Sequence, residues 1–452
     1  MYLKTIKLIA LVIILSVAEA NAQSVTSSPY SRYGLGDIYN SGTGHEIAMG
    51  GTTAAESKPV CINTTNPACN TNLLSQCFLF DVGGDVKYTD ISAASKSEKT
   101  CKATFKYLAG GFAAKPWWYF AFFMKPYSSM GYRSYSEEST DFDGQSYIYN
   151  NTYKGSGGLN KVAISTAFKF MKMFSVGFSG NVLFGSIERT QNSVMTRYGY
   201  TINEKTYPYS SQLYINDKRV MHGVQGDLGF RFEKSWRSSK DSLRDALRIS
   251  LGAFVNGKTK LNARNEIFMD DYHQYYAYRY SSVTYYTAKS DTISNDTVST
   301  AKVSLPKGFG IGASVEIAEQ LTINADYRTQ QWSDFALPDD ASNTKLRNNQ
   351  YFGLGMQYVR EKYFTSKYYR QIIYRIGAYK EKTYLEINGQ GIDNKGITFG
   401  LGFPIGWRLM LNANVQIGKR GTTEHNLYEE KYFMLHLNAI VRDTWFVKRK
   451  FQ

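Results

Sequence analysis

After its first 22 residues the sequence has no uninterrupted apolar run approaching the roughly 20 residues of a membrane-spanning helix. Charged residues are also sparse, at 20%. The few histidines form no His-x-x-x-His pair, and no Cys-x-x-Cys spacing suggests a zinc site. We therefore expect neither a metal site, nor a cofactor, nor an enzyme.

The first 22 residues have the pattern of a secretory signal. Lys4 and Lys7 precede a short apolar stretch, Leu8–Val17, and Ala20-Asn21-Ala22 is a small-x-small cleavage site. An exported chain without a membrane helix is either a soluble protein or a β-barrel. Export also permits disulfides. Of the four cysteines, Cys61, Cys69, Cys77 and Cys101, the first two form the easiest bridge.

The balance of charge is basic, with a formal net charge of +15. The lysines and arginines are scattered, often near expected strand ends, so we do not expect nucleic acid as a partner. Anionic lipid phosphates are a better counterpart for such a surface. The 36 tyrosines and 15% aromatic content suit strands whose rings lie at a membrane interface.

Residues 306–332 show the strand pattern most clearly. Phe309, Ile311 and Val315 alternate with small or charged residues, and the alternation resumes at Leu321 after a two-residue break. A period of two indicates strands with two unlike faces, and two such runs predict an antiparallel hairpin. A purely apolar face opposite a polar one suits a wall between lipid and a wet lumen. One hairpin of a soluble sandwich alternates in the same way.

The whole chain predicts an all-β fold, a 14-stranded antiparallel transmembrane β-barrel with an N-terminal plug. An even strand number is typical of bacterial single-chain barrels. The expected strands are 77–91, 102–114, 117–134, 160–171, 173–190, 219–234, 247–265, 306–317, 320–332, 349–361, 369–386, 393–404, 406–420 and 430–448.

The lengths of the connections favour the membrane barrel over the sandwich. Long connections at 135–159, 191–218, 267–305 and 333–348 alternate with shorter ones, as expected of outer loops and periplasmic turns. The tryptophans also divide between the outer and the periplasmic strand ends, which predicts an aromatic girdle. Trp332 is expected at the outer rim, and the periplasmic strand ends carry Trp117, Trp118, Trp236, Trp407 and Trp445.

We expect three parts: a signal peptide at 1–22, a plug at 23–76 and the barrel at 77–452. The plug region lacks a period of two but holds enough apolar residues to pack. Glu316, Asp326 and Arg328 share one face of the central hairpin. They would line a conduction path or, as we prefer, form a lumenal polar network that stiffens the barrel.

Two further stretches are candidate functional sites. The longest loop carries Tyr275, Tyr276 and Tyr278, which offer contact area for a ligand or partner, although an ordinary hairpin explains them equally well. Pro126 lies within an expected strand and cannot donate to the ladder. It predicts either a simple bulge or a lateral opening in the wall, formed by Met124, Pro126, Tyr127 and Met130.

The plug region contains Asn66-Pro67-Ala68 after Ala48-Met49-Gly50-Gly51. This pattern is similar to the plug signature of the FadL-type outer-membrane transporters of hydrophobic compounds, in the form found in Bacteroidetes-like bacteria. The family usually continues with Gly-Leu-Ala, whereas Cys69-Asn70-Thr71 follows here. Further similar stretches are Ser28–Asp37, Gly418–Gly421, Glu430–Tyr432 and Trp445–Lys450.

The resemblance implies a barrel in the outer membrane of a Gram-negative bacterium and passage of apolar molecules through its wall. Our first hypothesis is passive uptake of small, fatty-acid-like hydrophobic molecules through a lateral opening near residues 124–130, faced from inside by the segment around Asn66-Pro67-Ala68. The alternative is a structural or accessory barrel of a larger secretion or barrel-insertion complex. The partners are then outer-membrane lipid with a hydrophobic molecule, or other outer-membrane proteins.

Overall fold

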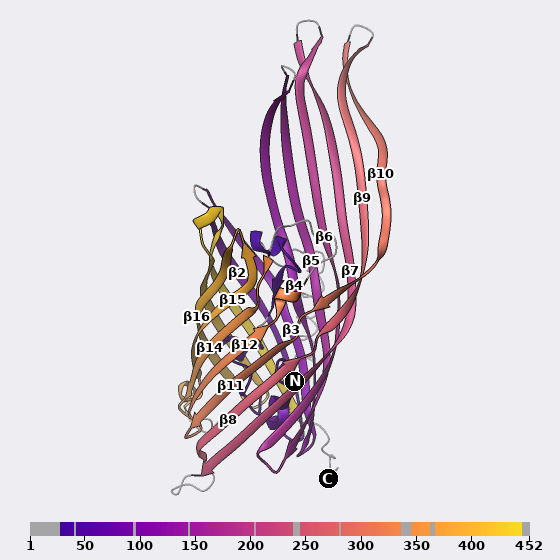
Figure 1. Ribbon diagram of the computed structural model, residues 1–452. Helices are drawn as coiled ribbons and strands as arrows, with labels where there is room; N and C mark the ends of the chain where they lie inside the picture. Colours follow the sequence, from indigo (N-terminus) through magenta and orange to yellow (C-terminus); the bar gives the residue numbers. More distant parts are fainter. Residues whose placement is uncertain are drawn as a thin grey trace, which may run out of the picture.

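The computed structural model describes residues 28–39, 42–93, 96–142, 145–202, 205–237, 245–279, 282–335, 345–361 and 367–444. Its wall is an antiparallel sheet that closes on itself, because β18 (Glu429–Thr444) pairs along its length with β2 (Cys77–Ala93) (Figure 1). The 14-stranded barrel predicted from the sequence is confirmed. Between β2 and β18 the wall strands are β3 (Lys96–Lys115), β4 (Trp118–Phe142), β5 (Gln145–Phe170), β6 (Phe174–Ile202), β7 (Lys205–Arg237), β8 (Asp245–Asn256), β11 (Gly308–Ile317), β12 (Leu321–Gln330), β14 (Asn349–Val359), β15 (Ile373–Ile387), β16 (Gln390–Ile405) and β17 (Leu409–Gly421).

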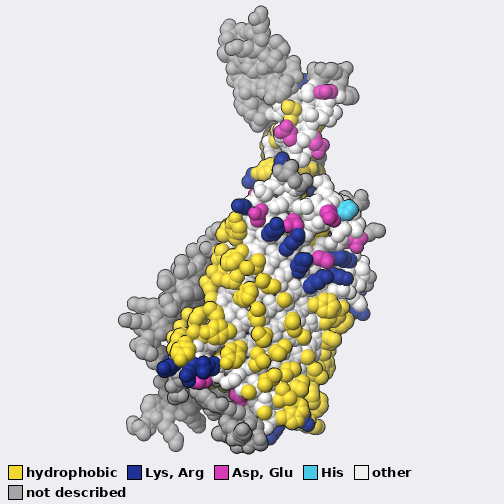
Figure 2. All heavy atoms as spheres, turned by 90° about the vertical axis from the view of Figure 1, so that its left-hand side faces the viewer, with side chains coloured by type: hydrophobic (Ala, Val, Ile, Leu, Met, Phe, Trp, Pro, Cys, Tyr) yellow, Lys and Arg dark blue, Asp and Glu magenta, His cyan; other side chains and the backbone are white. Residues whose placement is uncertain are grey.

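The alternation in the sequence becomes the two faces of the wall. In β11, Phe309 and Ile311 point outward with 44% and 52% of their surface exposed, whereas Ser314 and Glu316 point inward and are buried. The same pattern around the barrel makes a broad apolar band on the outer surface (Figure 2). No helix within the described residues is long and apolar enough to cross a membrane.

The wall has a tall half and a short half. Strands β4 to β7 have 25, 26, 29 and 33 residues, whereas β11 and β12 have 10 each. A transmembrane strand needs about 9–11 residues. The upper parts of β4 to β7 therefore rise far beyond the band.

A second hairpin completes this projection. Strand β9 (Thr259–Arg279) prolongs β8, β10 (Ser282–Leu305) leads into β11, and β9 pairs with the upper part of β7. We call the upper parts of β4 to β7, together with β9 and β10, the blade. In Figure 1 β10 stands at one edge of the blade.

The expectation of loops at 135–159, 191–218 and 267–305 is wrong, because the residues described in these ranges form paired strands. Tyr135 pairs with Thr152, and Val194 pairs with Gln212. Continuing the ladder satisfies the backbone donors and acceptors that a long loop would leave to water.

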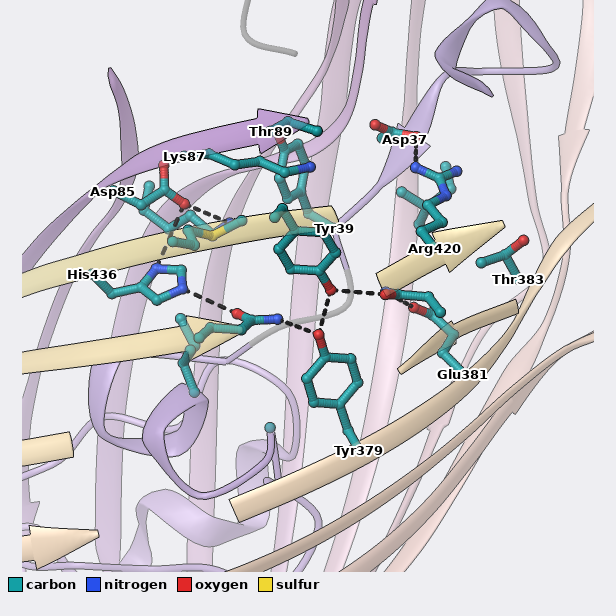
Figure 3. A pocket seen from close by; sticks show the side chains of 18 of the residues that line it. Asp37, Tyr39, Asp85, Lys87, Thr89, Tyr379, Glu381, Thr383, Arg420 and His436 are labelled. Carbon is teal, nitrogen blue, oxygen red and sulfur yellow. Dashed lines mark hydrogen bonds and ion pairs between the residues drawn. The ribbon is translucent and has the colours of Figure 1, made fainter. Parts of the chain in front are cut away.

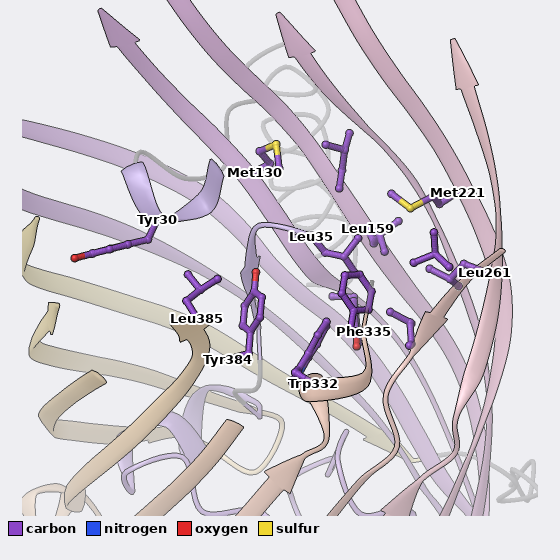
Figure 4. Packing of buried hydrophobic residues seen from close by; sticks show 14 of the residues in the cluster. Tyr30, Leu35, Met130, Leu159, Met221, Leu261, Trp332, Phe335, Tyr384 and Leu385 are labelled. Carbon is purple, nitrogen blue, oxygen red and sulfur yellow. The ribbon is translucent and has the colours of Figure 1, made fainter. Parts of the chain in front are cut away.

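A cluster of buried apolar residues lies at the base of the blade, where it closes the mouth of the barrel (Figure 4). Trp332 belongs to this cluster and is completely buried, 4.7 Å from the ring of Tyr384 and 5.1 Å from that of Phe335. The expectation that Trp332 lies in an outer girdle is wrong, because a short 3-10 turn at Trp332–Asp334 folds its indole inward. Trp117, Trp236 and Trp407 are exposed at the opposite strand ends, as expected, and Trp445 lies outside the described residues.

Candidate functional site

The lumen holds residues 28–39 and 42–76, which we call the inner segment. Most of its side chains are buried, and it touches opposite sides of the wall. Helix α2 (Gly44–Ala48) contacts β15 to β18, and the 3-10 turn η2 (Pro67–Asn72) contacts β4 to β7. The inner segment thus spans the barrel from the short half to the tall half.

The Asn66-Pro67-Ala68 motif attaches the inner segment to the tall half. The side-chain amide of Asn66 donates to the backbone oxygens of Ala54, at 2.6 Å, and of Phe230 in β7, at 3.2 Å. Its Oδ1 accepts from the backbone N–H of Ala68, at 3.1 Å, and caps η2. Pro67 follows at the first position of the turn, where its missing donor costs nothing.

Glycines in the wall let the backbone of the inner segment approach closely. A Cβ at Gly177 in β6 would lie 2.4 Å from the nitrogen of Ala68, and one at Gly377 in β15 would lie 2.1 Å from the nitrogen of Gly50. Any side chain would displace the inner segment at both places. Neither glycine was singled out from the sequence, although their alternating, inward positions were a signal that could have been used.

The charged face of the central hairpin binds the inner segment. Asp326 accepts from the backbone N–H groups of Thr53 and Ala54, at 2.6 and 2.8 Å. Arg328 donates to the oxygen of Gly51 at 2.9 Å, and Glu316 forms an ion pair with Lys58 at 3.1 Å. These contacts agree with a lumenal polar network, with the inner segment as one of its members.

A buried ion pair lies within the inner segment itself. His45 Nε2 is 3.0 Å from Glu56 Oε1, and both side chains are at most 3% exposed. Burial opposes the charge of both groups, but Cys61 and the Glu56 carboxylate raise the pKa of His45 well above its usual range. Burial likewise disfavours the Glu56 carboxylate, yet His45 holds its pKa below the ordinary value.

The pairing between β3 and β4 ends partway up the wall. Its last pair is Leu108 with Met124. Both strands are irregular there, because Lys106 is an extra residue in the β2–β3 ladder and Tyr127 is one in the β4–β5 ladder. We call this part of the wall, above Met124, the seam.

The start of the inner segment replaces β3 as the neighbour of β4. Strand β1 (Asp37–Ile38) pairs with Ser129 and Ser128, and the N–H of Tyr39 donates to the oxygen of Tyr127 at 2.9 Å. Below β1, Thr64 accepts from Lys125 at 3.1 Å. The segment around Asn66-Pro67-Ala68 therefore reaches the seam through Thr64, whereas Asn66 itself binds β7.

The four residues predicted for a lateral opening all lie along the seam. Met124 points outward and is 40% exposed, Pro126 is half-buried, and Tyr127 and Met130 are buried. Met130 packs in the apolar cluster beside Leu35 (Figure 4). The structure therefore brings these residues together, with the inner segment behind them.

Inside the seam lies a cavity of about 180 Å³ with a mixed polar and apolar lining (Figure 3). Asp85 lies 3.1 Å from Lys106 and 3.6 Å from His436, and Arg420 is paired with Asp37 at 2.6 Å. The apolar side chains of Ile38, Ile47 and Met434 also line it. Further lining residues carry hydroxyl or amide groups, among them Tyr379, Tyr432, Asn394, Gln416, Thr89 and Thr383. This cavity could not be predicted from the sequence, because its lining comes from both ends of the chain.

Two other expectations concern the tyrosines and the cysteines. Tyr275, Tyr276 and Tyr278 lie in β9, where their backbones pair with β10, and their side chains lie outside the described residues. The expected Cys61–Cys69 disulfide is absent, because all four cysteines are free. The Cys69 thiol instead donates to the oxygen of Ala54, at 3.3 Å.

A family model described as BamG matches residues 3–452, which is almost the whole sequence. None of the curated proteins matches this chain.

Solved structures with a similar fold are FadL-type channels. The toluene transporter TodX of Pseudomonas putida has a TM-score of 0.53 and 14% identity, covering 91% of this chain and 100% of its own. The toluene transporter TbuX of Ralstonia pickettii has a TM-score of 0.50 and 16% identity, covering 89% and 98%. A FadL homologue of Pseudomonas aeruginosa has a TM-score of 0.52 and 11% identity, covering 90% and 99%. The FadL-type fold expected from the sequence is thereby confirmed, whereas the Bacteroidetes-like branch stays a prediction.

Proposed function

This chain belongs to the BamG family, and we propose that it is an accessory barrel of a larger outer-membrane complex that secretes proteins or inserts barrels. The observation that carries the proposal is the blade. In this view the leader at 1–22 is removed, residues 23–76 act as a plug, and the barrel at 77–452 holds the blade above the membrane.

The blade has the properties of a docking surface for protein. Strand β10 has 24 residues and stands at its edge, and an edge strand offers a row of backbone donors and acceptors to another chain. Natural proteins usually shorten or cover such edges. An edge of this length is therefore best explained by a partner that pairs with it.

The filled lumen supports the same proposal. The inner segment is bound to both halves of the wall, and the lining of the cavity beside it includes many charged and hydroxyl groups. Binding of an apolar molecule beside those groups is unfavourable, because it would displace the water that solvates them. The apolar residues of the cluster at the base of the blade pack against one another, so the side chains of the protein itself occupy this space.

Trimming the blade tests this proposal. Residues 266–297 are replaced by an Asn-Gly turn between the paired residues Asn265 and Val298, which removes most of β9, β10 and Tyr275, Tyr276 and Tyr278. We expect co-purification of partners from gently solubilised membranes to fall at least about tenfold, because a strand-edge interface of many hydrogen bonds is removed.

The matched control shortens an interior hairpin by the same method. An Asn-Gly turn joins the paired residues Val194 and Gln212 of β6 and β7, which leaves the β10 edge in place. This variant is expected to retain its partners, and both variants should keep the heat-modifiable gel migration of a folded barrel. Equal partner recovery from wild type and from the β9–β10 variant would contradict the accessory role.

The second candidate function is passive uptake of small, fatty-acid-like hydrophobic molecules through the seam. It is favoured by one observation, namely that β4 exchanges β3 for the inner segment directly above Met124. Unpaired backbone facing lipid costs several kcal/mol for each group. An opening there would require β1 to leave β4 as the molecule passes.

A reversible staple tests uptake. Ile38 and Ser128 are directly paired, and the bond from Tyr39 N–H to Tyr127 places them in the closer, non-hydrogen-bonded type of pair. In a Cys101→Ser background, Ile38→Cys with Ser128→Cys is expected to slow uptake of a fluorescent fatty acid several-fold when oxidised. Dithiothreitol should restore the rate in the same cells.

Pro126→Val, which supplies β4 with a donor, is expected to slow uptake without affecting assembly. Uptake that is unchanged by both the staple and Pro126→Val rules out the seam as an exit. The staple leaves the blade intact, so partner recovery and uptake report separately on the two proposed functions.

A further inference from the structure

Four lysines form a continuous row across the outer face of the short half. Lys380 in β15 pairs with Lys395 in β16, which pairs with Lys419 in β17, which pairs with Lys431 in β18. All four side chains are exposed. We call these residues the lysine row. Neighbouring strands are about 4.8 Å apart, so the row is roughly 14 Å long.

The lysine row lies at the border of the apolar band. Each lysine is the next outward-facing residue after the last apolar one on its strand, which is Ala378, Ile397, Ile417 or Phe433. Figure 2 shows basic side chains along the upper border of the band on this face. This border is the level at which lipid acyl chains give way to headgroups.

The protein compensates only part of the charge of the row: Asp90 in β2 lies directly opposite Lys431, and Glu429 is shared by two of the lysines. Glu429 lies between two of the lysines, 2.5 Å from Lys419 and 3.3 Å from Lys431. Within the described part of the chain, Lys380 and Lys395 have no carboxylate in ion-pair distance, and the nearby Asp393 is paired with Arg347 at 2.6 Å. Like charges directly opposite one another destabilise a sheet. The arrangement therefore favours an anion supplied from outside the chain.

We propose that the lysine row binds the phosphate groups of lipids in the outer leaflet. The acyl chains of such a lipid lie on the apolar residues directly below, and its phosphates accept from Lys380 and Lys395. This amphipathic fit favours a lipid over an acidic protein, which would not need the adjoining apolar surface. The site is on the outer wall, far from the blade edge, and does not depend on the proposed function.

Binding of phosphatidylglycerol to the purified full-length chain in neutral detergent tests the proposal. Each lysine near an anionic headgroup contributes about a fivefold change in affinity. Lys380→Gln with Lys395→Gln is therefore expected to weaken binding of phosphatidylglycerol roughly 25-fold. Lys380→Arg with Lys395→Arg should bind like wild type.

A matched control removes the same charge from the opposite rim, with Lys115→Gln and Lys367→Gln, and should not alter binding. Phosphatidylcholine should bind all variants equally and weakly. Inorganic phosphate should not compete at equal concentration, because the proposed ligand also needs its acyl chains.

Thermal stability provides a second readout, because the difference in stability between the variant and wild type should reverse when lipid is added. In neutral detergent the Lys380→Gln, Lys395→Gln variant should be at least as stable as wild type, because a like-charge pair is removed. With phosphatidylglycerol added, wild type should become the more stable of the two. Undiminished binding of phosphatidylglycerol by the variant overturns the proposal. If partner recovery then falls instead, the row is a contact for an acidic protein.

Discussion

The tall and short halves of the wall have the same outward pattern across the membrane and differ beyond it. On the short side, the strands end soon after the apolar band, and four of them have a lysine at the border of this band. On the tall side, the strands continue as a paired sheet for more than the length that crosses the membrane. The band therefore positions the barrel, whereas the continued ladder gives one side a surface for partners.

The inner faces differ in the same way. The tall half receives Asn66 and Ala68 of the inner segment, at Gly177 and on the backbone of β7, whereas the short half receives the turn at Gly50. The inner segment is therefore anchored to two surfaces that are distant in sequence. Each anchor can be removed while the other is left intact.

The largest expected effect is all-or-none labelling, which tests whether the tall half faces the outside. In a Cys101→Ser background, Gln145→Cys at the tip of the β4–β5 hairpin should react with an impermeant maleimide on intact cells, as should Tyr275→Cys. Ser239→Cys, between β7 and β8, should react only after lysis. Labelling of Ser239→Cys on intact cells would reverse the orientation of the two halves.

The next effect concerns the ion pair of the inner segment. Glu56→Gln leaves His45 without its carboxylate, and breaking a buried pair costs about 3–5 kcal/mol. We expect the inner segment to become sensitive to protease while the wall stays folded. The matched control is Glu424→Gln, which neutralises an exposed carboxylate on the outer rim and should leave protease resistance unchanged.

The pair also predicts a dependence on pH. Because the pKa of His45 is raised, its contribution to the stability of the docked inner segment is complete below about pH 6.5. This contribution is lost as the pH rises through the pKa of His45 in the folded protein. Because the pKa of Glu56 is lowered, its contribution to the same stability is complete above about pH 4.3. This contribution is lost as the pH falls through the pKa of Glu56 in the folded protein. Protease resistance of the inner segment should therefore be greatest between these limits, and Glu56→Gln should flatten the profile.

The smallest effect separates the two anchors. A valine at Gly177 or at Gly377 meets the backbone of the inner segment and should destabilise its docking by about 1–3 kcal/mol. Gly180→Val, on the outward face of the same strand as Gly177, meets nothing within 4 Å and is the control. If limited proteolysis and thermal unfolding show Gly180→Val to be as damaging as Gly177→Val, the close approach is not what requires glycine.

Much of the barrel could be predicted because the alternation of side chains is local. Phe309, Ile311 and Val315 reveal the two faces of β11 without knowledge of any neighbour, and the same pattern predicted all fourteen wall strands. The seam was also visible in part, since Pro126 cannot donate to a neighbour. The sequence by itself thus determined the architecture, the strand order and the position of one irregularity.

The contacts of the strands and of the inner segment follow from the closed barrel and could not be predicted from the sequence. Trp332 turned inward, Asn66 bound β7 rather than the seam, and the lysines at 380, 395, 419 and 431 aligned through register alone. Each of these outcomes joins residues that are far apart in the chain. A period of two specifies which face a side chain takes, but register and loop packing specify its neighbours, and they depend on the closed barrel as a whole.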